Sequence, residues 1–477
     1  MKTNLVYNNI ARFGALALWG FSIATVSCRK AVEVTPPVTS LVSSTVFQDN
    51  AEASAAVTGI YISMAGYSGF FAGGPLGISA IMGMSADELN YFETDPLTSE
   101  IYQNAQVSTN PVPIWTPLYN YIYQANAADT GLSSSTKVSA SLRQQLIGEA
   151  KFIRAFCYFY LVNTYGDVPL TVTTNYEANT TASRTPLSLV YHQMVTDLKS
   201  AQSDLSDSYL DPSGNVTSDR VRPNKGAATA LLARIYLYQQ DWPDAEAQAT
   251  GVINQSGTYS LMGNLDSVFL TGSTEAIWQF QSITPGFNTQ DGYAFILMGP
   301  PNAATPFALN NDLMNVFEPG DLRRLYWVDS VTDGTNIYYF PFKYKVSYSS
   351  TVTEYTMVMR LAEQYLIRAE ARAMQNNLAG AISDVNVIRE RAGLDTLSST
   401  LTQSQTLAAI IRERQVEYFT EWGHRWYDLR RLKEIDVTMD TVCPQKGGVW
   451  NTEHQLFPIP FTEVQVNKNL VQNPGYQ

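Results

Sequence analysis

The sequence contains few of the residues from which metal sites and thiol enzymes are built. Three Cys and three His in 477 residues leave little material for either kind of site. The common signatures of serine hydrolases, zinc proteases, phosphate-binding loops and dinucleotide-binding turns are also missing. These absences favour a binding protein over an enzyme, and the sequence predicts no cofactor and no metal ion.

Charge is scarce as well. Asp, Glu, Lys and Arg make up 16% of the residues, the formal net charge is −12, and no basic patch stands out. Nucleic-acid binding is therefore not expected, because a phosphate backbone attracts basic surfaces. Aromatic residues, in contrast, reach 12% of the chain, with 28 Tyr. This composition suits an extracytoplasmic protein that binds neutral polar ligands, and the negative charge disfavours anionic glycans.

The chain begins with a secretory pattern. Lys2 and Arg12 precede an uncharged run over residues 13–26, and Ser27 and Cys28 follow. A basic start, a short apolar run and a small residue are typical of a signal peptide. We predict a lipoprotein signal peptide over residues 1–27, with Cys28 as the lipid-bearing first residue, and an extended tether over residues 28–45. The alternative is an ordinary signal peptide followed by an incidental cysteine.

The rest of the chain is mainly helical in its patterning. Apolar spacing predicts a strand over residues 276–281 and several helices, over residues 44–61, 115–129, 142–162, 187–205, 222–237 and 360–374. One internal repeat is visible, because residues 232–253 align with residues 368–389 and Ala245 then matches Ala381. Each unit is a helix, a turn and a second helix that begins with a small residue. We predict a mainly α fold, with a tetratricopeptide-like helical-pair scaffold and a few short strands.

Residues 282–350 differ from the helical parts. They are rich in Gly, Pro, Asn and aromatic residues and show no helical period. Aromatic rings offer apolar faces to sugar C–H groups or to peptide side chains, and neighbouring amides and carboxylates fix a ligand's orientation. We predict that this loop-rich, aromatic insertion is the ligand surface, with Phe287, Tyr293 and Trp327 in contact with ligand. A satellite hydrophobic cluster under long loops accounts for most of the other rings.

The stretch over residues 410–432, IIRERQVEYFTEWGHRWYDLRRL, combines a hydrophobic stripe with many charges. Tyr418, Trp422 and Trp426 recur at helical spacing, so we expect one docked helix with Trp426 in the core. Glu421 and Arg425 lie four residues apart, as helix neighbours do, and the charges predict a partly buried ion-pair network. The alternative is a catalytic carboxylate or a ligand-binding tryptophan in this stretch.

This stretch resembles the C-terminal signature of the SusD/RagB family. These are surface lipoproteins of Bacteroidetes-type bacteria that capture nutrients for an outer-membrane transporter. The matching residues are Glu413, Arg414, Glu417, Phe419, Glu421, Gly423, Arg425, Trp426, Asp428, Leu429 and Arg430. Further matching elements are GEAKFIRAF with YGDVP (residues 148–169), RLAEQYL (residues 360–366), and PIP with QNPGY (residues 458–476). The resemblance covers nearly the whole mature chain.

The resemblance implies a fold, a function and a partner. It divides the chain into an N-terminal SusD-like helical region (residues 46–275) and a C-terminal RagB/SusD region (residues 276–477). It implies a non-catalytic protein that is anchored to the outer membrane by lipid and exposed at the cell surface. Such a protein captures oligosaccharides for a SusC-type TonB-dependent transporter, on which it sits as a lid. A peptide-binding member of the same family is the alternative ligand class.

The resemblance also implies that the loop after an acidic pair approaches the ligand. Here the loop residues are Asn90, Tyr91 and Phe92, and the alternative is a polar loop capped by two acids.

The residues also bear on two other functions and on one disulfide. A glycosidase needs paired carboxylates, but the carboxylates with recognisable neighbours lie among arginines, which keep them ionised. An adhesive protein would show repetition and β-sandwich spacing, which the sequence lacks. A bridge between Cys157 and Cys443 stays open.

Overall fold

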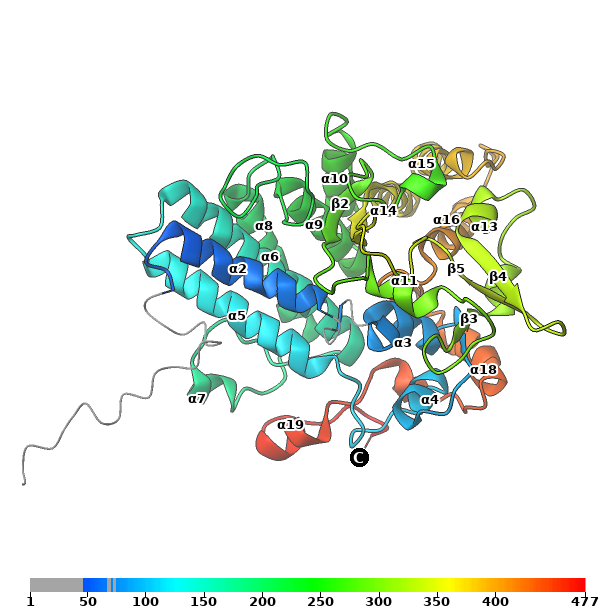
Figure 1. Ribbon diagram of the computed structural model, residues 1–477, viewed down its shortest axis with the longest axis horizontal. Helices are drawn as coiled ribbons and strands as arrows, with labels where there is room; N and C mark the ends of the chain where they lie inside the picture. Colours follow the sequence, from blue (N-terminus) through cyan, green and yellow to red (C-terminus); the bar gives the residue numbers. More distant parts are fainter. Residues whose placement is uncertain (1–45, 67–69, 72–73, 477) are drawn as a thin grey trace, which may run out of the picture. The chain divides into compact units, whose positions relative to one another are not determined.

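The computed structural model describes residues 46–66, 70–71 and 74–476 (Figure 1). The predicted signal peptide (residues 1–27), the predicted lipid-bearing Cys28 and the tether (residues 28–45) lie outside the described residues. Within the described part of the chain, no helix is both long enough and apolar enough to span a bilayer. Cys157 and Cys443 are both buried free thiols, so they do not form the disulfide that the sequence left open.

The first half of the chain is built from helices. Their bounds are α2 Asn50–Ala65, α3 Ile78–Ser85, α4 Pro96–Tyr102, α5 Trp115–Ser134, α6 Ala140–Tyr165, α7 Tyr176–Asn179 and α8 Leu187–Asp204, with a 3-10 turn η1 at Gly74–Leu76. Helix α2 begins later than predicted because Asp49 caps it, accepting a hydrogen bond from the Glu52 backbone N–H at 2.8 Å. Helices α5, α6 and α8 pack side by side (Figure 1).

Helix α6 shows why these segments are helical. Ala150, Ile153, Cys157 and Leu161 recur at helical spacing, and all four side chains are fully buried. The helix ends at Tyr165 because Gly166 follows with φ of 74°, a conformation that favours glycine. The central helix therefore follows directly from its sequence pattern.

The internal repeat corresponds to two helical pairs, as predicted. The first pair is α9 Lys225–Gln239 with α10 Trp242–Ile253, and the second is α14 Leu361–Met374 with α15 Leu378–Arg391. The two turns match in detail, because Gln240 and Asn376 are both left-handed, with φ of 61° and 63°. Ala245 and Ala381 are both fully buried, which lets each pair of helices cross closely. The tetratricopeptide-like scaffold is thereby confirmed.

Among the described residues, the strands form three separate two-stranded antiparallel sheets. β1 Leu89–Tyr91 pairs with β3 Phe307–Leu309, β2 Ala276–Phe280 with β6 Thr356–Arg360, and β4 Val328–Thr332 with β5 Ile337–Pro341. Strand β2 was predicted from the sequence, whereas the β4–β5 hairpin inside the insertion was not. The insertion also holds short helices, α11 Gln290–Phe295, α12 Asn311–Met314 and α13 Leu322–Tyr326, and follows the 3-10 turn η2 at Leu265–Ser267.

The closing stretch is not the one continuous helix that its spacing predicts. It consists of α16 Gln403–Tyr418 and α17 His424–Arg431, separated by a turn. Thr420 and Trp422 have φ of 54° and 52°, and Gly423 has φ of 73°. Tertiary contacts hold this turn, since the Trp422 indole N–H donates to the Met357 carbonyl of β6. The chain finishes with α18 Ile435–Gln445, the 3-10 turn η3 Thr452–Gln455 and α19 Phe461–Val466.

Trp426 lies in the core, as predicted, with no exposed surface. It belongs to the main hydrophobic cluster, together with Trp278, Trp422 and Phe156.

Candidate ligand-binding surface

Strand β1 carries the first group of predicted site residues. Asn90 and Tyr91 are half-buried, and Phe92, the residue after the strand, is 45% exposed. The Asn90 side-chain oxygen accepts hydrogen bonds from the Tyr102 hydroxyl at 3.3 Å and from the Asn310 amide at 3.2 Å. Its side-chain NH₂ has no partner among the described residues, so a ligand oxygen can accept from it.

Tyr91, Phe92 and Tyr338 form what we call the β1 aromatic group. The Phe92 ring meets the Tyr338 ring of β5 edge to face, with centroids 5.4 Å apart. The Tyr338 hydroxyl donates to Asp333 in the β4–β5 turn at 2.9 Å, which fixes the orientation of the ring. The sequence did not predict the β4–β5 hairpin. This hairpin places the Tyr338 ring against Phe92, which the sequence did predict as a site residue.

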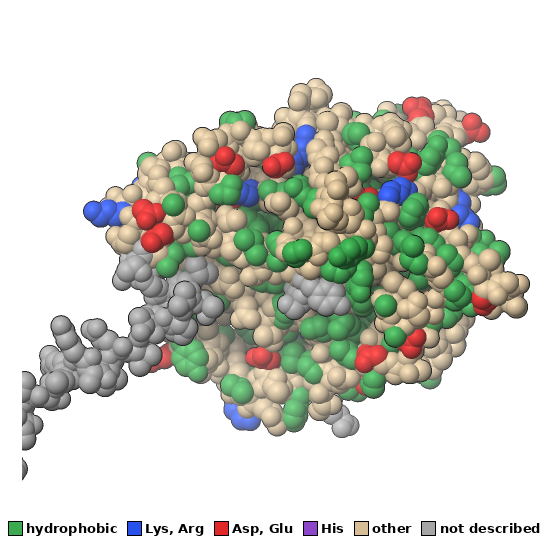
Figure 2. Space-filling view, viewed as in Figure 1, with side chains coloured by type: hydrophobic (Ala, Val, Ile, Leu, Met, Phe, Trp, Pro, Cys, Tyr) green, Lys and Arg blue, Asp and Glu red, His purple; other side chains and the backbone are tan. Residues whose placement is uncertain are grey.

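Phe287, Tyr293 and Tyr348 form what we call the α11 aromatic group. Phe287 meets Tyr293 edge to face at 4.5 Å and Tyr348 at 5.6 Å. Tyr348 is 73% exposed, so much of its ring faces solvent. Gly286 precedes Phe287 with φ of 88°, a left-handed conformation that favours glycine. Figure 2 shows hydrophobic side chains between polar ones on the face where α11 and β3 lie.

Strand β1 and helix α11 are linked through a ring of the β1–β3 pair. The Tyr91 ring lies 6.0 Å from the Phe307 ring of β3, which lies 6.0 Å from the Phe295 ring of α11. Residues near position 90 and residues near position 290 are far apart in sequence, but antiparallel pairing of β1 with β3 places them in one structure. Strand β1 and helix α11 therefore pack on the same buried rings, Phe307 and Phe295.

Trp327 does not belong to this surface, and its prediction as a ligand contact is wrong. The side chain has no exposed area, and its indole N–H donates to the Leu265 carbonyl at 3.0 Å. The Lys343 ammonium and the Arg360 guanidinium lie 5.0 and 5.7 Å from its ring. Trp327 is therefore a core residue, and the buried cations that cover it come from positions that sequence spacing could not place beside it.

Comparison with known proteins decides the family. Residues 172–476 match the profile of the SusD family, and residues 80–237 match a second profile, described as starch-binding associating with outer membrane. The chain belongs to the SusD family.

Members of the family match this chain over most of its length. It is 27% identical to SusD-like protein P25 of Formosa agariphila, over 94% of this chain and 97% of that one. It is 24% identical to starch-binding protein SusD of Bacteroides thetaiotaomicron, over 71% of this chain and 73% of that one.

Solved structures share the fold. A SusD homolog from Bacteroides thetaiotaomicron superposes with a TM-score of 0.78 at 20% identity, over 91% of this chain and 98% of that one. A laminarin-binding SusD-like protein superposes with a TM-score of 0.73 at 23% identity, over 90% of this chain and all of that one.

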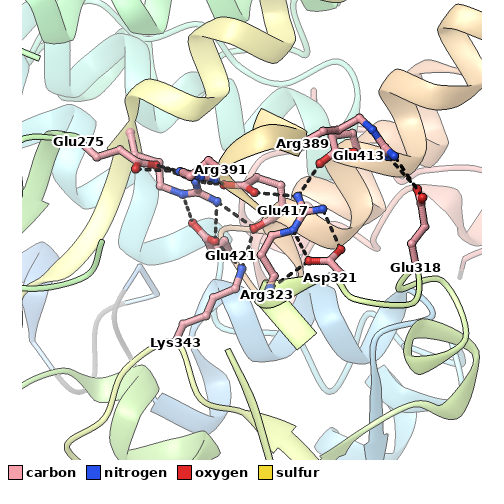
Figure 3. A network of polar contacts seen from close by, with 11 residues as sticks. Glu275, Glu318, Asp321, Arg323, Lys343, Arg389, Arg391, Glu413, Glu417 and Glu421 are labelled. Atoms are coloured by element: carbon pink, nitrogen blue, oxygen red, sulfur yellow. Dashed lines mark hydrogen bonds and ion pairs between the residues drawn. The ribbon is translucent and has the colours of Figure 1, made fainter. Parts of the chain in front are cut away.

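The SusD signature residues of α16 build a buried ionic network (Figure 3). Glu417 is its centre, because its carboxylate contacts the guanidinium groups of Arg323, Arg360 and Arg391. Glu413 and Glu421 extend the network on either side. The other members come from segments far apart in sequence, namely Glu275, Glu318, Asp321, Lys343 and Arg389. The signature therefore fastens the insertion to the helical scaffold.

The predicted ion pair between Glu421 and Arg425 is wrong. Arg425 instead stabilises the strand that carries predicted site residues. Glu421 pairs with Arg360 and Lys343, not with Arg425. Arg425 instead forms a two-pronged ion pair with Asp87, at 2.6 and 2.8 Å. Asp87 lies just before β1, so this signature arginine holds in place the strand that carries Asn90.

A cavity that the sequence did not indicate lies beside α2. We call it the α2 cavity, and its volume is about 180 Å³. Its apolar wall includes Tyr61, Ile62 and Phe280, and its polar rim includes Asp219 and Gln281. Ile283 also lines it, four residues before Phe287. The chain therefore connects the wall of this cavity to Phe287 within four residues, which makes the cavity a candidate extension of the ligand surface.

Two buried carboxyl groups lie beneath the surface. Burial raises the pKa of Glu88 to about 8, with Asp87 adding to the effect. Burial also raises the pKa of Asp291 to about 7, and its only side-chain partner among the described residues is the Ser79 hydroxyl, at 3.1 Å. Glu88 is 1% and Asp291 6% exposed. Both groups therefore face protein rather than the open surface.

Proposed function

We propose that this SusD-family protein is a non-catalytic surface protein that captures neutral oligosaccharides. One observation carries the proposal: Phe92 and Tyr348 expose their rings to solvent, Tyr293 is half-buried against Phe287, and the Asn90 amide keeps an unused donor. Sugar rings carry an apolar C–H face and a rim of hydroxyl groups, so they suit aromatic faces next to hydrogen-bonding groups. Two relatives are named for binding starch and laminarin, which are both glucans, and this supports the ligand class.

The proposal includes an anchor and a partner. The predicted lipid on Cys28 holds the protein at the outer membrane, and the profile described as associating with outer membrane supports this location. A SusC-type TonB-dependent transporter receives the captured oligosaccharide. The net charge of −12 favours neutral over anionic glycans, because like charges repel.

Catalysis is not part of the proposal. A glycosidase needs two carboxyl groups on opposite sides of an accessible sugar bond. The two carboxyls with strongly raised pKa values, Glu88 and Asp291, are buried. Most carboxylates of the closing stretch are held in ion pairs with arginines. Neither arrangement serves as a general acid facing a substrate.

The test is a binding assay with the mature protein. Starch and laminarin are screened by affinity gel electrophoresis, and soluble neutral oligosaccharides and short peptides by titration calorimetry. Phe92→Ala and Tyr293→Ala should each weaken glycan binding by about 5- to 30-fold, the effect of losing 1–2 kcal/mol of ring contact. Leu189→Ala is the control, because this leucine of α8 is 55% exposed and lines neither the α2 cavity nor any proposed ring group.

The thermal melts of all three variants should match that of the wild type. Glycan binding that is unchanged in both site variants would move the site elsewhere. Peptide binding without glycan binding, with the same dependence on the rings, would transfer the site to the peptide-binding alternative.

A further inference from the structure

A second cavity lies along the first half of α5, away from the surface described above. We call it the α5 cavity, and its volume is about 300 Å³. Its walls come from the start of α5, from residues 169–180 and from residues 463–470. Figure 1 shows α7 and α19 on the side of α5 opposite to α2. The α5 cavity shares no lining residue with the α2 cavity, so the two are separate sites.

One wall of the α5 cavity is a row of aromatic rings. Trp115, Tyr119 and Tyr123 follow one another at four-residue spacing, which places them on one face of the helix. Trp115 is 4% and Tyr123 38% exposed, with Tyr119 between them in burial. The Tyr119 hydroxyl donates to the Pro169 carbonyl at 2.8 Å, which fixes this ring. The row therefore runs from Trp115 in the core to Tyr123, whose ring is exposed at the rim of the cavity.

The opposite wall carries a carboxylate with no internal partner. Glu463 of α19 is partly buried, and its carboxylate makes no hydrogen bond or ion pair with any residue that the structure describes. Burial raises the pKa of Glu463. The side chain of Asn120, beside the rings, is likewise without a partner in the described part of the chain. A partly desolvated carboxylate gains free energy when hydroxyl groups donate to it.

The walls are held together without a ligand. The Asn467 amide donates to the Ala182 carbonyl and the Asn469 amide to the Thr181 carbonyl, both at 2.7 Å. Arg184 donates to the Val471 carbonyl at 3.1 Å. These bonds tie the segment after α19 to the loop that faces α5, so the α5 cavity is preformed. A preformed site loses less conformational entropy when it binds a ligand.

We propose that the α5 cavity is a second saccharide site, which takes one or two neutral sugar units. The C–H face of a sugar ring lies against Tyr119 and Tyr123, while its hydroxyls donate to the Glu463 carboxylate and bond with Asn120. An apolar ligand would leave the carboxylate unpaired, and an anionic ligand would be repelled by it. The inference rests on the lining of this cavity and extends the proposed function to a second place on the molecule.

The experiment uses a variant in which binding at the first proposed site, at Phe92 and Tyr293, is removed. The Phe92→Ala/Tyr293→Ala double variant is titrated with maltohexaose, laminarihexaose and xylohexaose. Residual binding of at least one of them is expected, at lower affinity than in the wild type. Adding Tyr123→Ala should weaken this residual binding about fivefold or more, and Glu463→Gln should weaken it too. Tyr123→Phe is the matched control, because it keeps the ring, and it should leave the residual affinity within about twofold.

The outcomes separate the two proposals. Wild-type binding that disappears completely in the double variant supports the first site and overturns the second. Residual binding that Tyr123→Ala leaves unchanged also overturns the second site. If the wild type binds none of the three oligosaccharides, both assignments to neutral glycans fail. Thermal melts of the Tyr123 and Glu463 variants that match the wild type show that any loss of binding is local.

Discussion

Replacing Glu417 by Gln should destabilise the protein more than any other single-atom change in the ionic network. Glu417 is fully buried, and its carboxylate contacts three guanidinium groups, those of Arg323, Arg360 and Arg391. Gln keeps the shape but removes the negative charge and turns an NH₂ group toward cationic donors. Removing one partner from a buried ion cluster costs about 3–5 kcal/mol, because the remaining charges stay buried and uncompensated.

The expected change in melting temperature follows from the size of the protein. Unfolding about 430 residues has an entropy of roughly 0.9 kcal/mol per kelvin, so a loss of 3–5 kcal/mol lowers Tm by about 3–5 °C. Differential scanning calorimetry measures this shift directly. Glu318→Gln is the matched control, because Glu318 lies at the rim of the network with its side chain 30% exposed. The Glu318→Gln variant should lose less than about 1 kcal/mol of stability.

The pH dependence of the stability loss in Glu417→Gln tests the same prediction independently. Burial alone would raise the pKa of Glu417, but Arg391, Arg360 and Arg323 hold it well below its usual value of 4.5. A carboxyl group with a lowered pKa contributes its full stability above the unfolded pKa and loses it as pH falls through the folded pKa. The difference between wild type and variant should therefore stay constant at neutral pH and shrink below pH 4.5. Equal losses for Glu417→Gln and Glu318→Gln at neutral pH would refute the reasoning.

Two other predictions concern buried side chains. Trp327→Ala and Trp426→Ala should each destabilise the protein by about 3–5 kcal/mol, as truncation of a buried large aromatic does, and a melt without a decrease in Tm would contradict either core assignment. Because burial raises the pKa of Asp291 to about 7, ionising it opposes folding, so this group makes the wild type less stable as pH rises from its unfolded pKa toward 7. Asp291→Asn should remove this pH-dependent loss of stability. Wild type and variant are therefore compared by thermal melts at acidic and at alkaline pH, and equal changes in Tm for the two proteins would contradict the raised pKa of Asp291.

Residues that are close together in the sequence were sufficient to predict the helical scaffold. The repeat was visible because each helical pair needs a turn and a small residue at fixed places, and Gln240 and Asn376 occupy matching left-handed turns. The core of α6 was equally readable, since Ile153 and Cys157 lie on its buried face. In these segments, the residues that define the element are neighbours in the sequence.

Long-range contacts explain what the sequence could not predict. The apolar spacing continues through Trp422, so the turn after α16 could be recognised only from its contact with β6. Arg425 has Glu421 four residues away, yet it pairs with Asp87, a partner more than three hundred residues distant. The same limit applies to the rings. Trp327 and Tyr348 lie in one insertion, but only the tertiary structure shows that the first is covered and the second is open.

The ionic network also constrains the order in which the chain can fold. Arg323, Arg360 and Arg391 are synthesised before Glu413 and Glu417, the α16 carboxylates that balance them. A chain that stops before α16 contains these arginines without those partners, and burying them would be strongly unfavourable. Glu275 and Asp321 balance part of this charge, and we expect the insertion to dock fully onto the helical scaffold only once α16 is present. Such dependence on distant residues is typical of slow folding, and it ties a native ligand surface to an intact C-terminus.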